Sequence, residues 1–119
     1  MKRSSFIIEG ATGNCASKVN GTYEPTDENQ FGLPVYIKKG DSGVYMEAAK
    51  AKGPNALRWY VKHQDNRGPG NSTCYGFIAI EESKSTALTV PYETQGKWTV
   101  YTADGFKLQD ALTCKEVMI

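Results

Sequence analysis

Two alternating segments around a short polar loop constrain the fold more than any other feature of the sequence. Apolar and polar side chains alternate over residues 35–38, and the alternation resumes over 44–49 after a loop at 39–43 of glycines and small polar residues. A side-chain period of two is typical of a β-strand, and such a loop favours chain reversal. We therefore predict an antiparallel hairpin whose second strand has one apolar face, made of Val44, Met46 and Ala48.

Further strands are predicted along the rest of the chain. Residues 57–63 place Leu57, Trp59 and Val61 on one face, and Arg58, Tyr60 and Lys62 on the other. Residues 97–102 also alternate, and Asp104-Gly105 is a hairpin-turn signal. Pro91 predicts an edge strand or extended loop over 87–92. With no convincing long helix, we predict an all-β fold. It is an antiparallel sandwich or barrel of seven to eight short strands, with residues 1–119 forming a single domain.

Charge and hydropathy narrow the class of protein. Fourteen basic and thirteen acidic residues give the chain of 119 residues a net charge of +1, whereas nucleic-acid binding favours a strong basic excess. The apolar run near the N-terminus covers only 6–8, shorter than the ~7–15 apolar residues of a secretory signal. No segment approaches the ~20 apolar residues of a membrane helix. We expect a soluble cytoplasmic protein without nucleic-acid or membrane partners.

The cysteines and the single histidine do not form a recognisable reactive motif. The chain has an odd number of cysteines without Cys-x-x-Cys spacing, namely Cys15, Cys74 and Cys114. We therefore expect free thiols, and we expect no metal site or cofactor. His63 lies next to a polar loop, with no local pattern that pairs it with a nucleophile. We predict that the protein is not an enzyme and has no catalytic residues. A small hydrolase that uses His63 remains a remote alternative.

The candidate binding residues are aromatic and basic side chains on the predicted strands. We expect Tyr36 and Tyr45 to share the face opposite Val35 and Val44. That face would be exposed in a sandwich, whereas a barrel or a second layer would bury the rings. Tyr and Arg are frequent in binding hot spots, and Tyr can also stack on a sugar or a base. The candidate binding residues are Tyr36, Lys38, Tyr45, Arg58, Tyr60 and Lys62.

These observations favour a non-catalytic interaction module. It would bind a protein or peptide through the aromatic and basic face, or through the loop over 64–73. The alternative is a small-ligand binder that takes a sugar or lipid in the mouth of a barrel. A platform of outward tyrosines would favour the first function, and a hollow barrel lined with tyrosines the second.

Three short motifs resemble a small β-rich module of uncharacterised proteins, notably of protists and algae. The motifs are Asn20-Gly21-Thr22-Tyr23, Gly32-Leu33-Pro34-Val35-Tyr36 and Trp59-Tyr60-Val61, and Lys97-Trp98 resembles the closing tryptophan of that pattern. The resemblance covers about two-thirds of the chain. It implies a structural module without known activity, and it transfers no catalytic residue.

Overall fold

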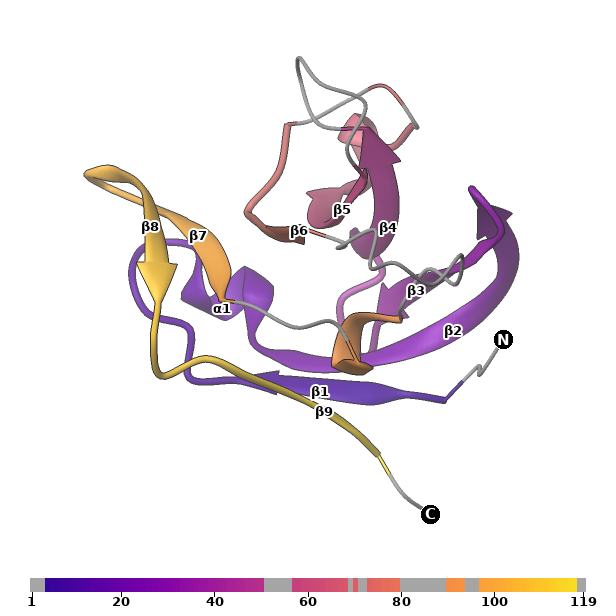
Figure 1. The fold of residues 1–119 in the computed structure, drawn as a ribbon, viewed down its shortest axis with the longest axis horizontal. Helices are drawn as coiled ribbons and strands as arrows, with labels where there is room; N and C mark the ends of the chain where they lie inside the picture. The colour runs from indigo at the N-terminus through magenta and orange to yellow at the C-terminus, as the bar shows by residue number, and fades with distance from the viewer. Residues whose placement is uncertain are drawn as a thin grey trace, which may run out of the picture.

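In the part of the chain that it describes, the computed structural model has nine antiparallel strands in one sheet, which curls into a half-barrel (Figure 1). It describes residues 4–50, 57–68, 70, 73–79, 90–93 and 97–117. The strands are β1 (Phe6–Glu9), β2 (Gly21–Gln30), β3 (Leu33–Lys38), β4 (Val44–Lys50), β5 (Leu57–His63), β6 (Gly76–Ala79), β7 (Trp98–Thr102), β8 (Gly105–Gln109) and β9 (Thr113–Glu116). The helical elements are α1 (Ala16–Val19), η1 (Gln64–Asn66) and η2 (Pro91–Glu93). The predicted all-β antiparallel fold is confirmed. The described residues form nine strands where seven to eight were predicted, and the single curled sheet is a half-barrel.

Proline changes one predicted element. Where an edge strand or extended loop was expected over 87–92, the structure has the short 3-10 helix η2, which begins at Pro91. Proline cannot donate to a strand ladder, and its fixed φ suits the first turn of a helix. Residues 87–89 lie outside the described part of the chain. Within that part, no helix has the length and apolar character needed to cross a membrane.

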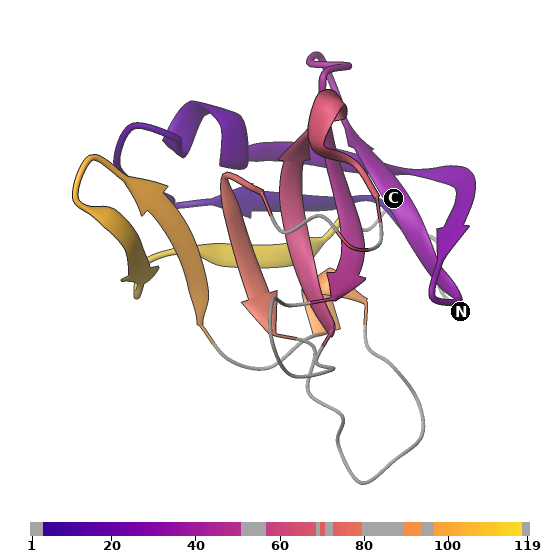
Figure 2. The ribbon, with the colours of Figure 1, turned by 90° about the horizontal axis from the view of Figure 1, so that it is seen from above.

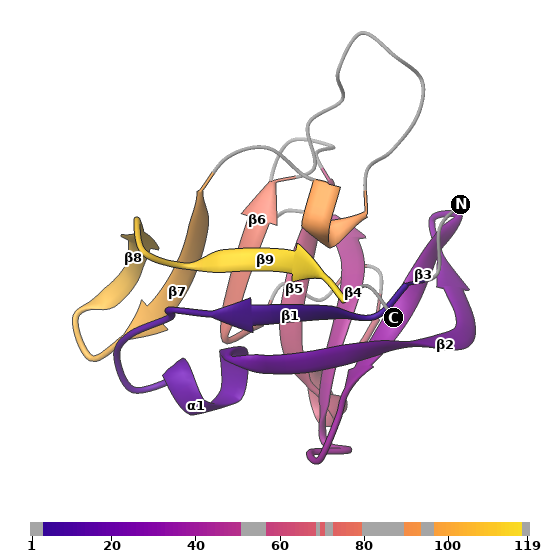
Figure 3. The same cartoon turned by 90° about the horizontal axis from the view of Figure 1, so that it is seen from below.

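The strands form a meander with one return. β1 to β8 pair in chain order, and β9 then comes back to lie beside β1, as Figure 3 shows. The two edges of the sheet are therefore β8 and β9, although these strands follow one another in the chain. In Figure 2, β8 is the outermost strand, next to β7.

The predicted hairpin is confirmed as β3 and β4. Met46 lies opposite Tyr36 on β3 and opposite Val61 on β5, and residues in such cross-strand pairs share a face of the sheet. Val44, Met46 and Ala48 are all buried on this inner face, as their alternation predicted. Trp59 and Val61 also lie there, so β4 and β5 present one continuous apolar surface to the interior.

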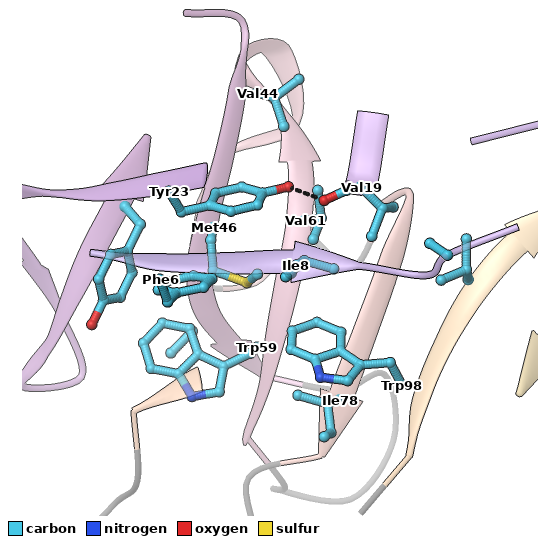
Figure 4. Close-up of a cluster of buried hydrophobic side chains, with 14 of the residues drawn as sticks. Phe6, Ile8, Val19, Tyr23, Val44, Met46, Trp59, Val61, Ile78 and Trp98 are labelled. Carbon is cyan, nitrogen blue, oxygen red and sulfur yellow. Dashed lines mark hydrogen bonds between the residues drawn. The ribbon is translucent and has the colours of Figure 1, made fainter. Parts of the chain in front are cut away.

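Aromatic side chains fill the half-barrel (Figure 4). The ring of Phe6 stacks on Tyr23 at a centroid distance of 5.1 Å and meets the edge of Tyr36 at 4.8 Å. Tyr36 in turn contacts Trp59 at 5.8 Å in an edge arrangement. Such pairs contribute about 0.5–1.5 kcal/mol beyond the burial of their surface. The Tyr23 hydroxyl donates to the Val19 carbonyl at 2.8 Å, so this buried polar group is satisfied.

The loop after β1 contacts the end of the edge strand β8. The backbone N–H and the Oγ1 hydroxyl of Thr12 donate to Oε1 of Gln109, at 3.0 and 2.9 Å. Gly10, just before this contact, has a φ of +86°, and a side chain at this position would collide with the carbonyl oxygen of Ala111. The segment between β1 and α1 therefore lies against the end of β8 and closes the half-barrel on that side.

This contact predicts a large cost for a side chain at Gly10. We expect Gly10→Ala to lower the free energy of unfolding by about 2–4 kcal/mol, because it adds a collision with backbone to an unfavourable φ. Gly40→Ala is the matched control, since Gly40 has a similar φ of +83° but no neighbouring atom within 4 Å. It should cost only about 1 kcal/mol. Urea denaturation measures both, and equal losses would contradict the closing role of the loop.

Candidate functional site

Tyr36 does not belong to an exposed binding face. The expectation that Tyr36 and Tyr45 share a face is wrong, because Tyr36 lies opposite Met46 whereas Tyr45 lies opposite Ile37. Tyr36 therefore points into the core and is fully buried. Tyr45 points to the outer face of the sheet, where it is half-buried.

Lys38 also lies on the inner side and has a structural role. Its Nζ donates to the carbonyl oxygens of Ser17 and Lys18, at 2.6 and 3.0 Å, and so satisfies carbonyl groups of α1. Gly21 leaves room for the lysine side chain, since a Cβ at that position would lie 2.6 Å from Lys38 Cε. Burial lowers the pKa of the Lys38 ammonium. Its position fixes the end of α1, and the side chain is not free to meet a partner.

On the outer face, an ion-pair network with a buried centre joins β4 and β5. Glu47 and Lys62 are both fully buried, with Lys62 Nζ 3.0 Å from Glu47 Oε2. Glu47 also accepts from the Gly68 backbone N–H at 2.8 Å and from Arg67 Nε at 2.8 Å. Burial by itself would raise the pKa of Glu47, but these hydrogen bonds and the Lys62 charge outweigh it and hold the pKa below its ordinary value.

The same network positions the segment after β5. Both terminal nitrogens of Arg67 donate to the carboxylate of Glu28, at 3.1 and 2.7 Å, and its guanidinium lies 4.5 Å from the Tyr45 ring centroid. The segment thus folds back over the two predicted binding residues Tyr45 and Lys62. The loop expected over 64–73 begins as the 3-10 helix η1, and residues 69, 71 and 72 lie outside the described part.

Arg58 and Tyr60 lie beside a different aromatic surface. They occupy the outer face of β5, as predicted, with Tyr60 buried and Arg58 half-buried. The Arg58 guanidinium lies 4.2 Å from the ring centroid of Phe77 on β6, and the Tyr60 ring lies 5.9 Å from the same residue. Among the described residues, no carboxylate forms an ion pair with Arg58. Arg58 therefore places a positive charge at the border of this surface.

Three exposed apolar side chains form what we call the β7–β8 surface: Tyr101, Phe106 and Leu108. The half-buried Phe77 of β6 lies beside them. The Phe106 ring contacts Phe77 at 5.6 Å and Tyr101 at 5.2 Å. Tyr101 and Phe106 are each 46% exposed, and Leu108 is 66% exposed. Grouped apolar exposure of this kind marks contact surfaces more often than single exposed residues do.

The sequence contains a pattern that indicates this surface. Trp98 and Val100 face the core, so the alternation of β7 sends Tyr101 outward. The Asp104-Gly105 turn then places Phe106 opposite Tyr101 and Leu108 opposite Thr99. Extending the alternation of β7 across that turn would have identified the three exposed side chains of the β7–β8 surface.

An open hollow of about 500 Å³ adjoins the β7–β8 surface. It lies where the start of α1, the segment before β6 and the β7–β8 hairpin meet. Its lining is mostly apolar and includes two thiols, and its residues are Cys15, Thr73, Cys74, Tyr75, Tyr101 and Phe106. Its volume lies within the range of about 300–1,000 Å³ for ligand pockets.

The three cysteines are free thiols, as expected, and are protonated near neutral pH. Burial raises the pKa of Cys74 and of Cys114 to about 12, and it also raises the pKa of Cys15. Since the thiolate is the reactive form, these environments do not activate the cysteines. Within the described ranges, no group of three or more His, Cys, Asp and Glu side chains is placed to hold a metal ion.

His63 makes a local contact at the end of β5. Its Nδ1 accepts the backbone N–H of Asp65 at 3.1 Å and so caps the helix η1. The Asp65 carboxylate lies 3.4 Å from the same nitrogen, and its side chain is 79% exposed. These contacts give His63 a role in the turn that leads to Arg67.

The chain matches no protein-family model, no curated protein and no solved structure. The resemblance of its Asn-Gly-x-Tyr, Gly-x-Pro-x-Tyr and Trp-x-Val motifs to an uncharacterised β-rich module therefore stays a prediction. The features that bear on function are the chemistry of the exposed surface and its position at an edge of the sheet.

Proposed function

We propose that the protein is a non-catalytic module that binds an extended segment of a protein or peptide along β8. The observation that carries this proposal is the position of Phe106 and Leu108. Both side chains are exposed, both point to the same face, and both belong to a strand at the edge of the sheet. An edge strand combined with an exposed apolar face offers two complementary ways to hold a partner.

The first of these is backbone pairing. β8 pairs with β7 on one side and, among the described strands, has no neighbour on the other. An edge of this kind presents unpaired N–H and C=O groups, and an extended peptide can add to it as a further strand. Main-chain hydrogen bonds then supply affinity, and contacts with alternate side chains supply specificity.

The second is side-chain contact with the β7–β8 surface. A strand added to β8 would direct every second side chain toward Phe106 and Leu108. The adjoining hollow, lined in part by Tyr101 and Phe106, offers space for one bulky apolar side chain. Aromatic residues beside a pocket are typical anchors of protein interfaces.

A small apolar ligand in this hollow is the second candidate function. The volume of about 500 Å³ and the mostly apolar lining favour it. The interior of the half-barrel is filled by the core cluster that includes Phe6, Tyr36 and Trp59. Such a ligand would therefore bind in the hollow and not inside the half-barrel. A small ligand would need the hollow but not the free edge of β8.

Changing the two exposed side chains of β8 tests the proposal. Peptides selected from a random library on the wild-type protein are expected to bind Phe106→Ser/Leu108→Ser at least about tenfold more weakly, since buried apolar anchors dominate such interfaces. Phe31→Ser is the matched control, because Phe31 is an exposed aromatic residue at the turn between β2 and β3. Fluorescence anisotropy gives the affinities, and circular dichroism checks the fold.

The outcomes separate the two candidate functions. Loss of binding in the β8 variant, with full binding by Phe31→Ser, supports peptide binding at β8. Equal binding by both variants, or a library that yields no peptide, contradicts it. A fluorescent apolar probe that binds the wild type and is displaced by no selected peptide would favour the small-ligand candidate.

A further inference from the structure

The edge strand β8 carries a positive charge, Lys107, in addition to its two exposed apolar side chains. Lys107 lies between Phe106 and Leu108 in the strand, so its side chain points to the opposite face. It is exposed, and no carboxylate of the described residues lies within ion-pair distance of it. β8 thus presents two apolar side chains on one face and an unbalanced positive charge on the other.

A strand that pairs with β8 meets both faces in turn. Its side chains alternate between the side of Phe106 and Leu108 and the side of Lys107. Residues directly opposite one another in an antiparallel pair interact, favourably for opposite charges and unfavourably for like charges. Resting on the proposed function, we propose that the partner of β8 is an extended segment in which apolar residues alternate with acidic ones.

The same lysine argues against a second copy of this chain as the partner. When two antiparallel β8 strands pair along their whole length, Phe106 lies opposite Leu108 of the other copy and Lys107 lies opposite itself. Two like charges directly across a strand pair are destabilising. A lysine on an edge strand is also a common device against edge-to-edge association. The charge therefore disfavours the self-paired register and favours an acidic strand.

The other edge of the sheet provides a comparison. β9 carries Lys115 and Glu116 side by side, so its charges are balanced within the strand. The large exposed apolar side chains among the described residues include none from β9. β9 therefore lacks the combination that marks β8, although both strands end the sheet.

Synthetic peptides with matched patterns test the partner chemistry. One blocked peptide alternates valine with glutamate, and the other alternates valine with lysine. The glutamate peptide is expected to bind the wild-type protein about three- to tenfold more tightly than the lysine peptide. Lys107→Glu should reverse this preference. Lys115→Glu makes the same charge change on β9 and should leave the preference unchanged.

Each result has a defined meaning. A preference for glutamate that Lys107→Glu reverses and Lys115→Glu does not supports the inference. Equal binding of the two peptides, sensitive to Phe106→Ser/Leu108→Ser, overturns the acidic pattern but leaves peptide binding at β8 in place. A preference that both lysine variants change equally reflects overall charge and overturns the inference.

If neither peptide binds, the inference fails, while peptides selected from the random library still test the proposed function. Sedimentation that shows dimers of the wild type, lost in the Phe106→Ser/Leu108→Ser variant, would identify a second copy as the occupant.

Discussion

Replacing Glu47 with glutamine is expected to lower the free energy of unfolding by about 3–5 kcal/mol, as found when one partner of a buried ion pair is removed. Lys62 and Glu47 are fully buried, and their side chains lie 3.0 Å apart. Without the carboxylate, the Lys62 ammonium keeps a hydrogen bond to the Gly68 carbonyl but loses its counter-charge. Urea denaturation at neutral pH measures the loss.

Glu28→Gln provides the control for this prediction. Glu28 binds the same Arg67 as Glu47 does, but its side chain is 58% exposed. An exposed ion pair contributes about 1 kcal/mol or less, so we expect a small change. Similar losses of unfolding free energy in the two variants would mean that burial does not determine how much an ion pair contributes to stability.

The pH dependence of the Glu47→Gln effect checks its cause. The folded state holds the pKa of Glu47 below its ordinary value of 4.5. The stability that this carboxylate contributes is therefore present above about pH 4.5 and is lost as the pH falls through the lower, folded-state pKa. The difference between wild type and Glu47→Gln should shrink in acid. A difference that stays constant with pH would contradict an ionised Glu47 in the folded protein.

Trp59→Ala is expected to lower the free energy of unfolding by about 3–5 kcal/mol, the usual cost of removing a large buried ring. Trp59 is fully buried, contacts the Tyr36 ring, and lies opposite Ala48 on β4 and Ile78 on β6. The cavity would open at the centre of the half-barrel, where neighbouring strands limit relaxation. Urea denaturation followed by circular dichroism measures the change.

Leu108→Ala is the matched control for the core variant. It also removes apolar volume, but from a side chain that is 66% exposed on the edge strand. Substitutions at such positions usually change stability by about 0.5 kcal/mol or less. Equal losses of stability at Trp59 and Leu108 would contradict the assignment of one to the core and the other to the exposed β7–β8 surface.

Local alternation predicted the strands well, but it did not predict which face of β3 meets the core. Period-two patterns correctly placed Met46, Trp59 and Val61 on apolar strand faces. Which side of β3 meets the core depends on how β3 and β4 pair, and a slip of one residue exchanges every side chain between faces. The turns after Lys38 place Tyr36 opposite Met46, and this pairing is not visible in either strand alone.

The outer network could not be predicted for a different reason. Glu28, Glu47 and Arg67 come from separate parts of the chain, and each looks like an ordinary surface residue in its own segment. Only the return of the segment after β5 brings them together and buries Lys62. By contrast, the β7–β8 surface follows from one local turn, so the sequence held enough information to predict it.

The most direct test of peptide binding at β8 is amide hydrogen exchange with and without the valine–glutamate peptide. Pairing with an added strand predicts slower exchange for backbone amides within β8, whereas the amides of β9 should exchange at unchanged rates. Slower exchange confined to β9 or to residues 64–68, with β8 unchanged, would contradict the proposed site.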